Sequence, residues 1–133
     1  MKFSIITITY NSEKTLEETI RSVVNQNYPE LEYIIIDGKS TDNTISIIKK
    51  YEDKISYWVS EKDKGICDAF NKGIAVATGD VIGIINSDDI LLPGALQAVE
   101  KAYKADVDVY YGDGIRIFED GSIKPYKAKH HRK

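Results

Sequence analysis

The sequence predicts an α/β fold: a mostly parallel sheet flanked by helices, with antiparallel strands near the C-terminus. Short apolar, β-branched runs alternate with segments of helical period, the order expected of a parallel sheet with right-handed crossovers. Towards the end of the chain the apolar period changes to two, and a hairpin turn signal follows.

Four strands are expected in the parallel part. The first, second and fourth are unbroken apolar runs, which are typical of strands buried on both faces of a sheet. The expected strands are residues 3–9, 31–37, 56–60 and 81–85.

Helices are expected between these strands. Thr15 and Glu18 form a capping-box pattern in which Thr15 caps a helix and Glu18 reaches back to it. Leu16, Ile20 and Val23 then fall on one face of that helix. Further helices are expected at residues 44–51 and 66–77, and a fourth is expected to begin at Pro93.

The last part of the chain reads as antiparallel. Val107, Val109 and Tyr111 alternate with polar residues, and Asp120-Gly121 is a turn signal before residues 122–126. We therefore expect antiparallel strands at the end of an otherwise parallel sheet, within a single domain that spans residues 1–133.

Composition narrows the function classes. The 133 residues are 42% hydrophobic, which is enough for a core, and the single Cys67 fits a reducing cytoplasm better than an oxidising compartment. A net charge of −3 argues against nucleic-acid binding. The basic stretch 124–133, with His130 and His131, reads as a solvated tail or as a contact with anionic lipid or with a continuation of the chain.

Each of the four expected strands ends in a polar cluster. These clusters are residues 9–11, 37–42, 61–65 and 86–89. The carboxyl ends of parallel strands lie along one edge of the sheet, and open sheets of this kind bind ligands there. The sequence therefore predicts a ligand site built from these four loops.

Asp88 and Asp89 are adjacent carboxylates that repel each other and favour a nearby cation. With Asn86 they offer three oxygen donors on one turn, a ligand set that suits Mg²⁺ or Mn²⁺. The alternative is a structural one, in which Asp88 or Asp89 caps the helix expected from Pro93.

Asp37 has two interpretations as well. It could open an Asx-type turn, or it could accept a hydrogen bond from an N–H group of a nucleobase. Tyr10 could stack on that base or simply pack against its neighbours.

Several chemistries are excluded by the absence of their motifs from the sequence. No Gly-x-Gly-x-x-Gly, no Walker-type phosphate loop and no Gly-x-Ser-x-Gly elbow is present. The receiver-domain fold needs a carboxylate pair after the first strand, where this chain has Thr9, Tyr10 and Asn11.

Five segments resemble, in order and spacing, family 2 glycosyltransferases of the GT-A fold, which are Rossmann-like. They are SIITITYN (4–11), IDGKSTDNT (36–44), SEKDKGI (60–66), DAFNKG (68–73) and NSDD (86–89). The resemblance covers the chain from Phe3 to about Tyr126. It identifies these residues as the nucleotide-sugar-binding, N-terminal part of such a domain.

The resemblance also implies roles for single residues. Asp37 corresponds to the aspartate that binds the base, and Asp88 to the main metal ligand, with Asp89 beside it. Asn86 stands where the family's metal motif commonly has Asp, so it brings an oxygen without a charge. The other nucleotide-sugar-binding residues implied are Thr9, Tyr10, Asn11, Asp63, Gly65 and Asn71.

The implied reaction is metal-dependent, inverting transfer from a nucleotide sugar, with a UDP-sugar favoured, to a saccharide or lipid-linked saccharide, as in polysaccharide biosynthesis. The family's acceptor site and catalytic base come from a later region, so we expect these 133 residues to end before it. Asp113 is the one candidate base within them. The alternative is a nucleotide-sugar-binding module without transfer activity. Self-association and attachment to the cytoplasmic face of a membrane are left open.

Overall fold

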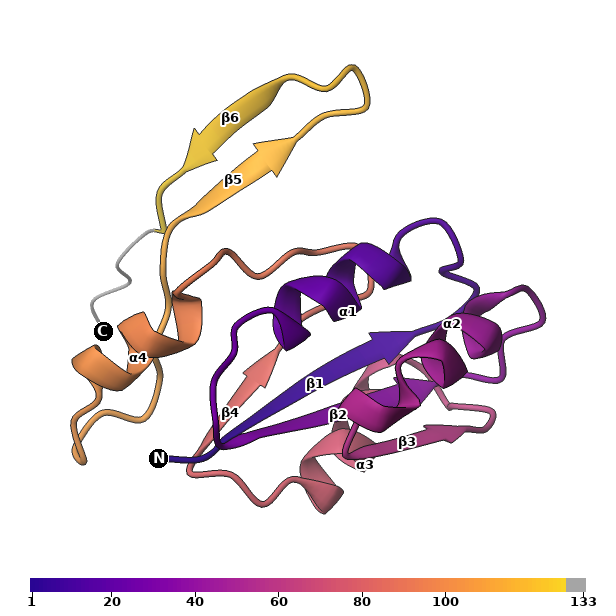
Figure 1. The fold of residues 1–133 in the computed structure, drawn as a ribbon, viewed down its shortest axis with the longest axis horizontal. Helices are drawn as coiled ribbons and strands as arrows, with labels where there is room; N and C mark the ends of the chain where they lie inside the picture. The colour runs from indigo at the N-terminus through magenta and orange to yellow at the C-terminus, as the bar shows by residue number, and fades with distance from the viewer. Residues whose placement is uncertain (129–133) are drawn as a thin grey trace. The chain divides into compact units, whose positions relative to one another are not determined.

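Four parallel strands form the main sheet of the protein, in the order β3-β2-β1-β4 (Figure 1). The computed structural model describes residues 1–128, and the chain divides after Lys101 into two compact units. The strands are β1 (Phe3–Thr9), β2 (Leu31–Asp37), β3 (Tyr57–Ser60) and β4 (Val81–Ile84). The expected parallel sheet is therefore confirmed, with its first two strands at the predicted residues.

β1 is one of the two inner strands of the sheet and pairs with β2 and β4. Phe3 is in register with Leu31 on one side and with Val81 on the other, and both pairings are parallel. Thr9, at the carboxyl end of β1, is in register with Asp37. The loops that follow β1 and β2 therefore leave the sheet side by side.

Helices cover the two faces of the sheet unequally. Leu16, Ile20 and Val23 of α1 (Leu16–Val24) pack with Phe3 and Tyr33 in the larger core cluster. The same cluster receives Ile48 of α2 (Thr44–Lys50) and Leu96 of α4 (Ala95–Ala102).

The opposite face carries a smaller cluster under α3 (Ile66–Val76), where Ala69 packs on Ile6, Ile34 and Ile36. The close packing depends on Gly73, because a Cβ there would lie 2.6 Å from Ile6 Cγ2. A 3₁₀ turn (Glu52–Lys54) precedes β3.

Three local expectations were wrong. Thr15 stands at the N-terminus of α1 but makes no side-chain capping bond, so the capping box does not form. The fourth helix begins at Ala95 rather than Pro93. β4 was expected to be buried on both faces, yet Ile82 and Ile84 are 42% and 45% exposed because β4 is an edge strand whose α3 side is uncovered.

The second unit contains a separate two-stranded antiparallel sheet. β5 (Gly114–Ile117) pairs with β6 (Ile123–Tyr126) around the turn at Gly121, so antiparallel strands near the C-terminus are confirmed. They are not hydrogen-bonded to the parallel sheet, contrary to expectation. The alternating residues 107–111 form no strand. No residue from 102 to 128 is buried, so hydrophobic alternation alone did not produce a strand there.

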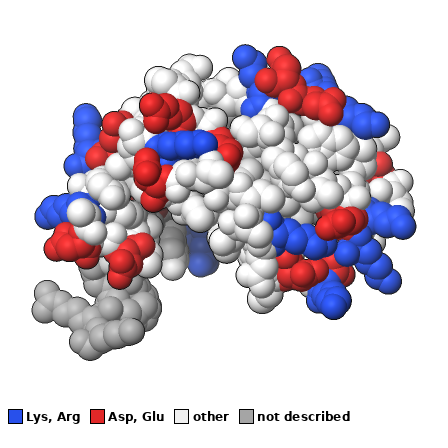
Figure 2. Space-filling model, turned by 90° about the horizontal axis from the view of Figure 1, so that it is seen from below, with Lys and Arg blue, Asp and Glu red and all other residues white. Residues whose placement is uncertain are grey.

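Charged side chains of both signs are interspersed on the face shown in Figure 2, without a large patch of one sign. This pattern agrees with the net charge of −3 and gives no support to a nucleic-acid surface on that face. Among residues 1–128, no helix has the length and apolar character needed to cross a membrane. His130, His131 and the rest of the basic tail after Ala128 lie outside the described residues.

Candidate functional site

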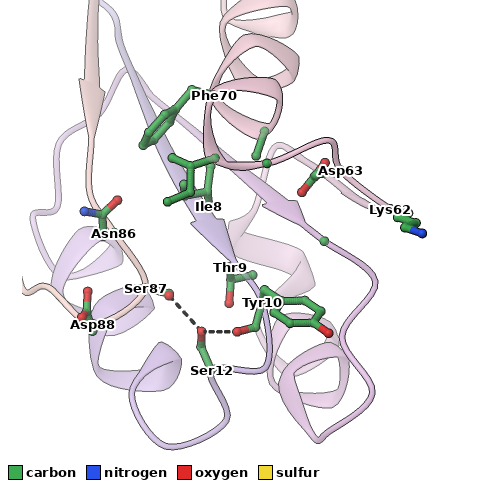
Figure 3. Close-up of a pocket in the computed structure, with 14 residues that line it drawn as sticks. Ile8, Thr9, Tyr10, Ser12, Lys62, Asp63, Phe70, Asn86, Ser87 and Asp88 are labelled. Atoms are coloured by element: carbon green, nitrogen blue, oxygen red, sulfur yellow. Dashed lines mark hydrogen bonds between the residues drawn. The ribbon is translucent and has the colours of Figure 1, made fainter.

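A cavity of about 590 Å³ opens at the carboxyl edge of the parallel sheet (Figure 3). The loops after all four parallel strands contribute to it, together with the first turns of α3. Its lining residues are Ile8, Thr9, Tyr10, Ser12, Gly38, Lys62, Asp63, Gly65, Ile66, Ala69, Phe70, Asn86, Ser87 and Asp88. The structure thus brings the four polar strand-end clusters together, all within the first unit.

One wall of the cavity is the turn that follows β4. Asn86 and Asp88 line the cavity, and the turn is closed by a hydrogen bond from the Asp89 N–H to the Asn86 carbonyl (3.0 Å). Ser87 is fixed to the β1 side through its hydroxyl, 2.9 Å from the Ser12 hydroxyl. Asp89 is exposed but does not line the cavity.

The two carboxylates of this turn influence each other. Partial desolvation and the neighbouring Asp88 carboxylate raise the pKa of Asp89, while a hydrogen bond with Asn86 opposes the increase. A cation between the turn and a ligand would relieve this repulsion.

Helix α1 holds the segment after the turn with a row of polar side chains. Thr19, which is fully buried, donates to the Asp89 carbonyl (2.6 Å), and Ser22 accepts from the Leu91 N–H (3.0 Å). Gln26 donates to the Leu92 carbonyl (2.8 Å) and accepts from the Leu96 N–H (3.3 Å). Thr19 and Ser22 lie one turn apart on α1, and Gln26 lies in the turn after it, so α1 and its C-terminal turn fix the backbone that follows Asp88.

The opposite wall carries Tyr10 and Thr9 at the end of β1. Tyr10 is 62% exposed, and its ring stands free at the cavity (Figure 3). Thr9 Oγ1 is buried, and within residues 1–128 it has no hydrogen-bond partner. A buried hydroxyl that lacks a partner at a cavity wall is available to a ligand or a bridging water.

Asp37 is placed differently from the base-binding role implied by the resemblance. Its side chain is 0% exposed and does not line the cavity. Its oxygens accept hydrogen bonds from the Ser40 N–H (2.9 Å), the Ser40 hydroxyl (2.5 Å) and the Ser60 hydroxyl (2.7 Å). This placement favours the turn-forming interpretation of Asp37.

Asn11 and Asn71 also lie away from the cavity lining. Asn11 has a left-handed backbone conformation (φ 45°), and its side-chain oxygen accepts from the Thr41 N–H (2.8 Å). It therefore ties the loop after β1 to the loop after β2. Asn71 is an exposed residue of α3.

Asp63 is held at the cavity by Lys72 of α3. The Lys72 ammonium lies 2.7 Å from Asp63 Oδ1 and 3.1 Å from Glu61 Oε1. The hydrogen bond to Asp63 is the main cause of a strongly raised pKa at Lys72. Gly65, with φ 124°, then turns the chain into α3 in a conformation that side chains other than glycine rarely adopt.

The residues at the turn after β4 fit a divalent ion shared with a ligand, rather than a closed protein cage. In residues 1–128 no three His, Cys, Asp or Glu side chains gather closely enough to hold a metal. Mg²⁺ and similar ions commonly bind through one or two carboxylates and the phosphates of a substrate. Asp88 and Asn86 face the cavity, as this arrangement requires.

Asp113, the candidate base, belongs to the second unit. Its Oδ1 accepts a hydrogen bond from the Ala128 N–H (3.0 Å), and it borders a separate hollow with Val109 and Tyr110.

The sequence patterns did not single out Gly38, Ser12 or Phe70 as cavity residues, nor Lys72 as the partner of Asp63. Gly38 has no side chain that could have indicated a functional role. Asp68 and Lys72 stand four residues apart, a spacing that predicts an ion pair on a helix, and their charged atoms are 3.7 Å apart. This spacing could have marked Lys72 as a residue that binds carboxylates.

Comparison with known proteins agrees with the fold. The model of the family described as "Glycosyl transferase family 2" matches residues 4–132. GalNAc(5)-diNAcBac-PP-undecaprenol beta-1,3-glucosyltransferase of Campylobacter jejuni is 34% identical over 132 residues, covering 96% of this chain and 43% of that protein. This chain spans less than half the length of curated relatives such as this one.

Two solved structures are similar in fold. Staphylococcus aureus TarS 1–349, in complex with UDP-GlcNAc, has a TM-score of 0.71 and 32% identity, covering 76% of this chain and 30% of that chain. The mannosyltransferase PcManGT from Pyrobaculum calidifontis, in complex with GDP-Man and Mn²⁺, has a TM-score of 0.66 and 27% identity, covering 76% and 31%.

Proposed function

This chain belongs to glycosyl transferase family 2, and we propose that its cavity binds a nucleotide-sugar donor, with a UDP-sugar favoured, together with Mn²⁺ or Mg²⁺. The sugar would pass, with inversion, to a saccharide or lipid-linked saccharide acceptor. Support comes from the named relatives, which are glycosyltransferases, and from TarS and PcManGT, which were crystallised with nucleotide sugars.

One observation supports the proposal above all: the cavity has two chemically different ends. Asn86 and Asp88 lie at one end, and the exposed ring of Tyr10 lies across the cavity from them (Figure 3). An aromatic face suits a planar base, and an oxygen-rich turn suits a metal-bound diphosphate. A nucleoside diphosphate places these two groups at opposite ends of one molecule.

The roles of the chain's own residues follow from this orientation. Tyr10 would position the base, and Asp88 and Asn86 would hold the diphosphate end through a shared cation. That cation, when bound, neutralises the charge that develops on the leaving diphosphate. Inversion requires a base on the far side of the anomeric carbon, and none of the residues lining the cavity is assigned to that step.

Calorimetry with UDP tests this function. We expect UDP to bind in the presence of Mn²⁺ and to lose at least about tenfold in affinity when EDTA replaces the metal. Asp88→Ala should abolish most of that difference, whereas Asp53→Ala, at an exposed position on the 3₁₀ turn, should leave it unchanged. Equal affinities with metal and with EDTA would contradict metal-bridged binding.

A further inference from the structure

We infer that Asp63, held by Lys72, reads the nucleobase of the donor, and that it selects a base with a single imide N–H group, as in uracil or thymine. This inference rests on the proposed function and goes beyond it by naming the residue that sets base specificity.

The carboxylates near Tyr10 differ in whether they can reach a ligand. Asp37 cannot, because it is fully buried and already accepts three hydrogen bonds from Ser40 and Ser60. Asp63 lines the cavity, and its side chain is 14% exposed. It lies on the same side of the cavity as Tyr10, across from Asn86 and Asp88 (Figure 3).

This position also separates Asp63 from the expected diphosphate end. A carboxylate beside a diphosphate would repel it, whereas a carboxylate beside the base can accept a hydrogen bond. The aromatic ring and the carboxylate together therefore define the base end of the cavity.

Gly38 lies between Tyr10 and Asp63. A Cβ added at Gly38 would lie 3.0 Å from Asp63 Oδ2 and 3.5 Å from Tyr10 Cδ2. The glycine thus leaves the space that the Asp63 carboxylate uses next to the ring. Any side chain at position 38 would compete with Oδ2 for it.

The two carboxylate oxygens of Asp63 differ in their partners. Its Oδ1 is bonded to the Lys72 ammonium at 2.7 Å, and no hydrogen bond from residues 1–128 is made to Oδ2. One free oxygen matches the single imide N–H of uracil. Guanine presents two adjacent N–H donors and would need both oxygens, and cytosine presents an acceptor at N3.

Lys72 is a positioning residue in this arrangement. Its ammonium also contacts Glu61 at 3.1 Å and Asp68 at 3.7 Å, so it joins the loop after β3 to helix α3. Losing it would leave the Asp63 charge in place but free the carboxylate to turn away from the ring.

The experiment compares three ligands in the presence of Mn²⁺: UDP, its N3-methylated analogue and CDP. On the unmodified chain we expect UDP to bind about 10- to 100-fold more tightly than the other two, since a hydrogen bond to a carboxylate supplies this much discrimination. Asp63→Asn can donate to N3 of cytosine, so it should bring UDP and CDP within about threefold of each other.

Two further variants separate positioning from general charge effects. Lys72→Met should reduce the UDP-to-CDP ratio while thermal unfolding shows that the fold persists. Glu61→Gln removes a charge beside the same lysine, but Glu61 does not line the cavity, so the ratio should stay unchanged.

The outcomes distinguish this inference from the function on which it rests. If UDP binds and Asp63→Asn keeps the original ratio, or if N3-methylated UDP binds as tightly as UDP, the base-reading role is overturned and the donor site stands. If no nucleoside diphosphate binds with Mn²⁺, the proposed function fails and the inference fails with it.

Discussion

At the scale of single residues, Asp37 is a carboxylate enclosed by the turn after β2 and the end of β3. Replacing it with Ala removes the acceptor for three hydrogen bonds and leaves the Ser40 N–H and the Ser60 hydroxyl without their partner. We expect Asp37→Ala to lower the free energy of unfolding by roughly 2–4 kcal/mol. Chemical denaturation measures this. A fully stable variant with weakened UDP binding would instead support direct contact between Asp37 and the base.

Replacing Gly38 should affect UDP binding more than stability, the reverse of what is expected for Asp37. The methyl group of Gly38→Ala would meet the Asp63 carboxylate, which is the movable end of a side chain. The carboxylate can shift, so the free energy of unfolding should change by less than about 1 kcal/mol, while UDP affinity falls by about tenfold or more. Denaturation and calorimetry on the same variant check both statements, and unchanged UDP affinity would count against the crowding argument.

At the scale of elements, the polar face of α1 determines where the turn after β4 is held. Thr19→Val keeps the shape of the side chain but removes its hydrogen bond to the Asp89 carbonyl. We expect a loss of about 1–3 kcal/mol in unfolding free energy and a weaker effect of Mn²⁺ on UDP affinity.

Thr15→Val is the matched control for that prediction. Thr15 precedes the same helix, is exposed and makes no capping bond. Its replacement should change stability by less than about 0.5 kcal/mol, as for ordinary surface positions. A cost of about 1 kcal/mol would instead restore the capping role that the sequence pattern suggested.

Glu32 of β2 bonds to β1 and to the loop between α3 and β4, and it makes stability depend on pH. Its oxygens accept hydrogen bonds from the Ser4 hydroxyl (2.7 Å), the Thr78 N–H (2.8 Å) and the Thr78 hydroxyl (2.9 Å). Burial alone would raise the pKa of Glu32, but these bonds and the nearby Lys2 bring it below its ordinary value of 4.5. A depressed carboxyl pKa stabilises the fold above the unfolded value, and the contribution is lost as pH falls through the folded value.

We therefore expect Glu32→Gln to cost about 1–2 kcal/mol near pH 7 and progressively less below about pH 4.5. Urea denaturation at several pH values measures the difference from the unmodified chain. Glu30→Gln is the control. Glu30 is 66% exposed, and its ion pair with the N-terminal amine is long, at 3.8 Å, so its replacement should have little effect at any pH. A cost that does not depend on pH would show that ionisation of Glu32 is not involved.

The elements that could be predicted from the sequence are those decided by local pattern. β1 and β2 are unbroken β-branched runs, and their bounds are as predicted, while α1 buries the three residues on its predicted face. The polar loops at the strand ends were predictable because parallel strands share a carboxyl edge.

What could not be predicted depends on contacts between distant segments. An aspartate at a strand end suits a turn or a ligand equally well, and the pattern does not show that the hydroxyls of Ser40 and Ser60 donate to Asp37. Lys72 and Asp63 are nine residues apart and meet because α3 folds back over the loop. The strand pattern of residues 107–111 lacked a neighbouring strand and a buried face.

At the scale of the whole molecule, the two units differ in how much surface they bury. The first unit contains both core clusters, whereas no residue from 102 to 128 is buried. An isolated two-stranded sheet has marginal stability in water. We expect amide hydrogens of β5 and β6 to exchange much faster than those of β1 and β2, as measured by mass spectrometry. Equal protection of the two sheets against exchange would contradict the marginal stability expected of the two-stranded sheet.

The residues that line the cavity have a property that matters during synthesis: all of them lie between Ile8 and Asp88 in the chain. Once residues 1–101 have emerged from the ribosome, all residues that line the cavity are available, and the cavity can form before the second unit is made. Domains generally fold in this order, from the N-terminus. A ligand that binds only the folded state adds to its stability by mass action. The nucleotide of the proposed function would in this way stabilise the first unit before synthesis of the chain is complete.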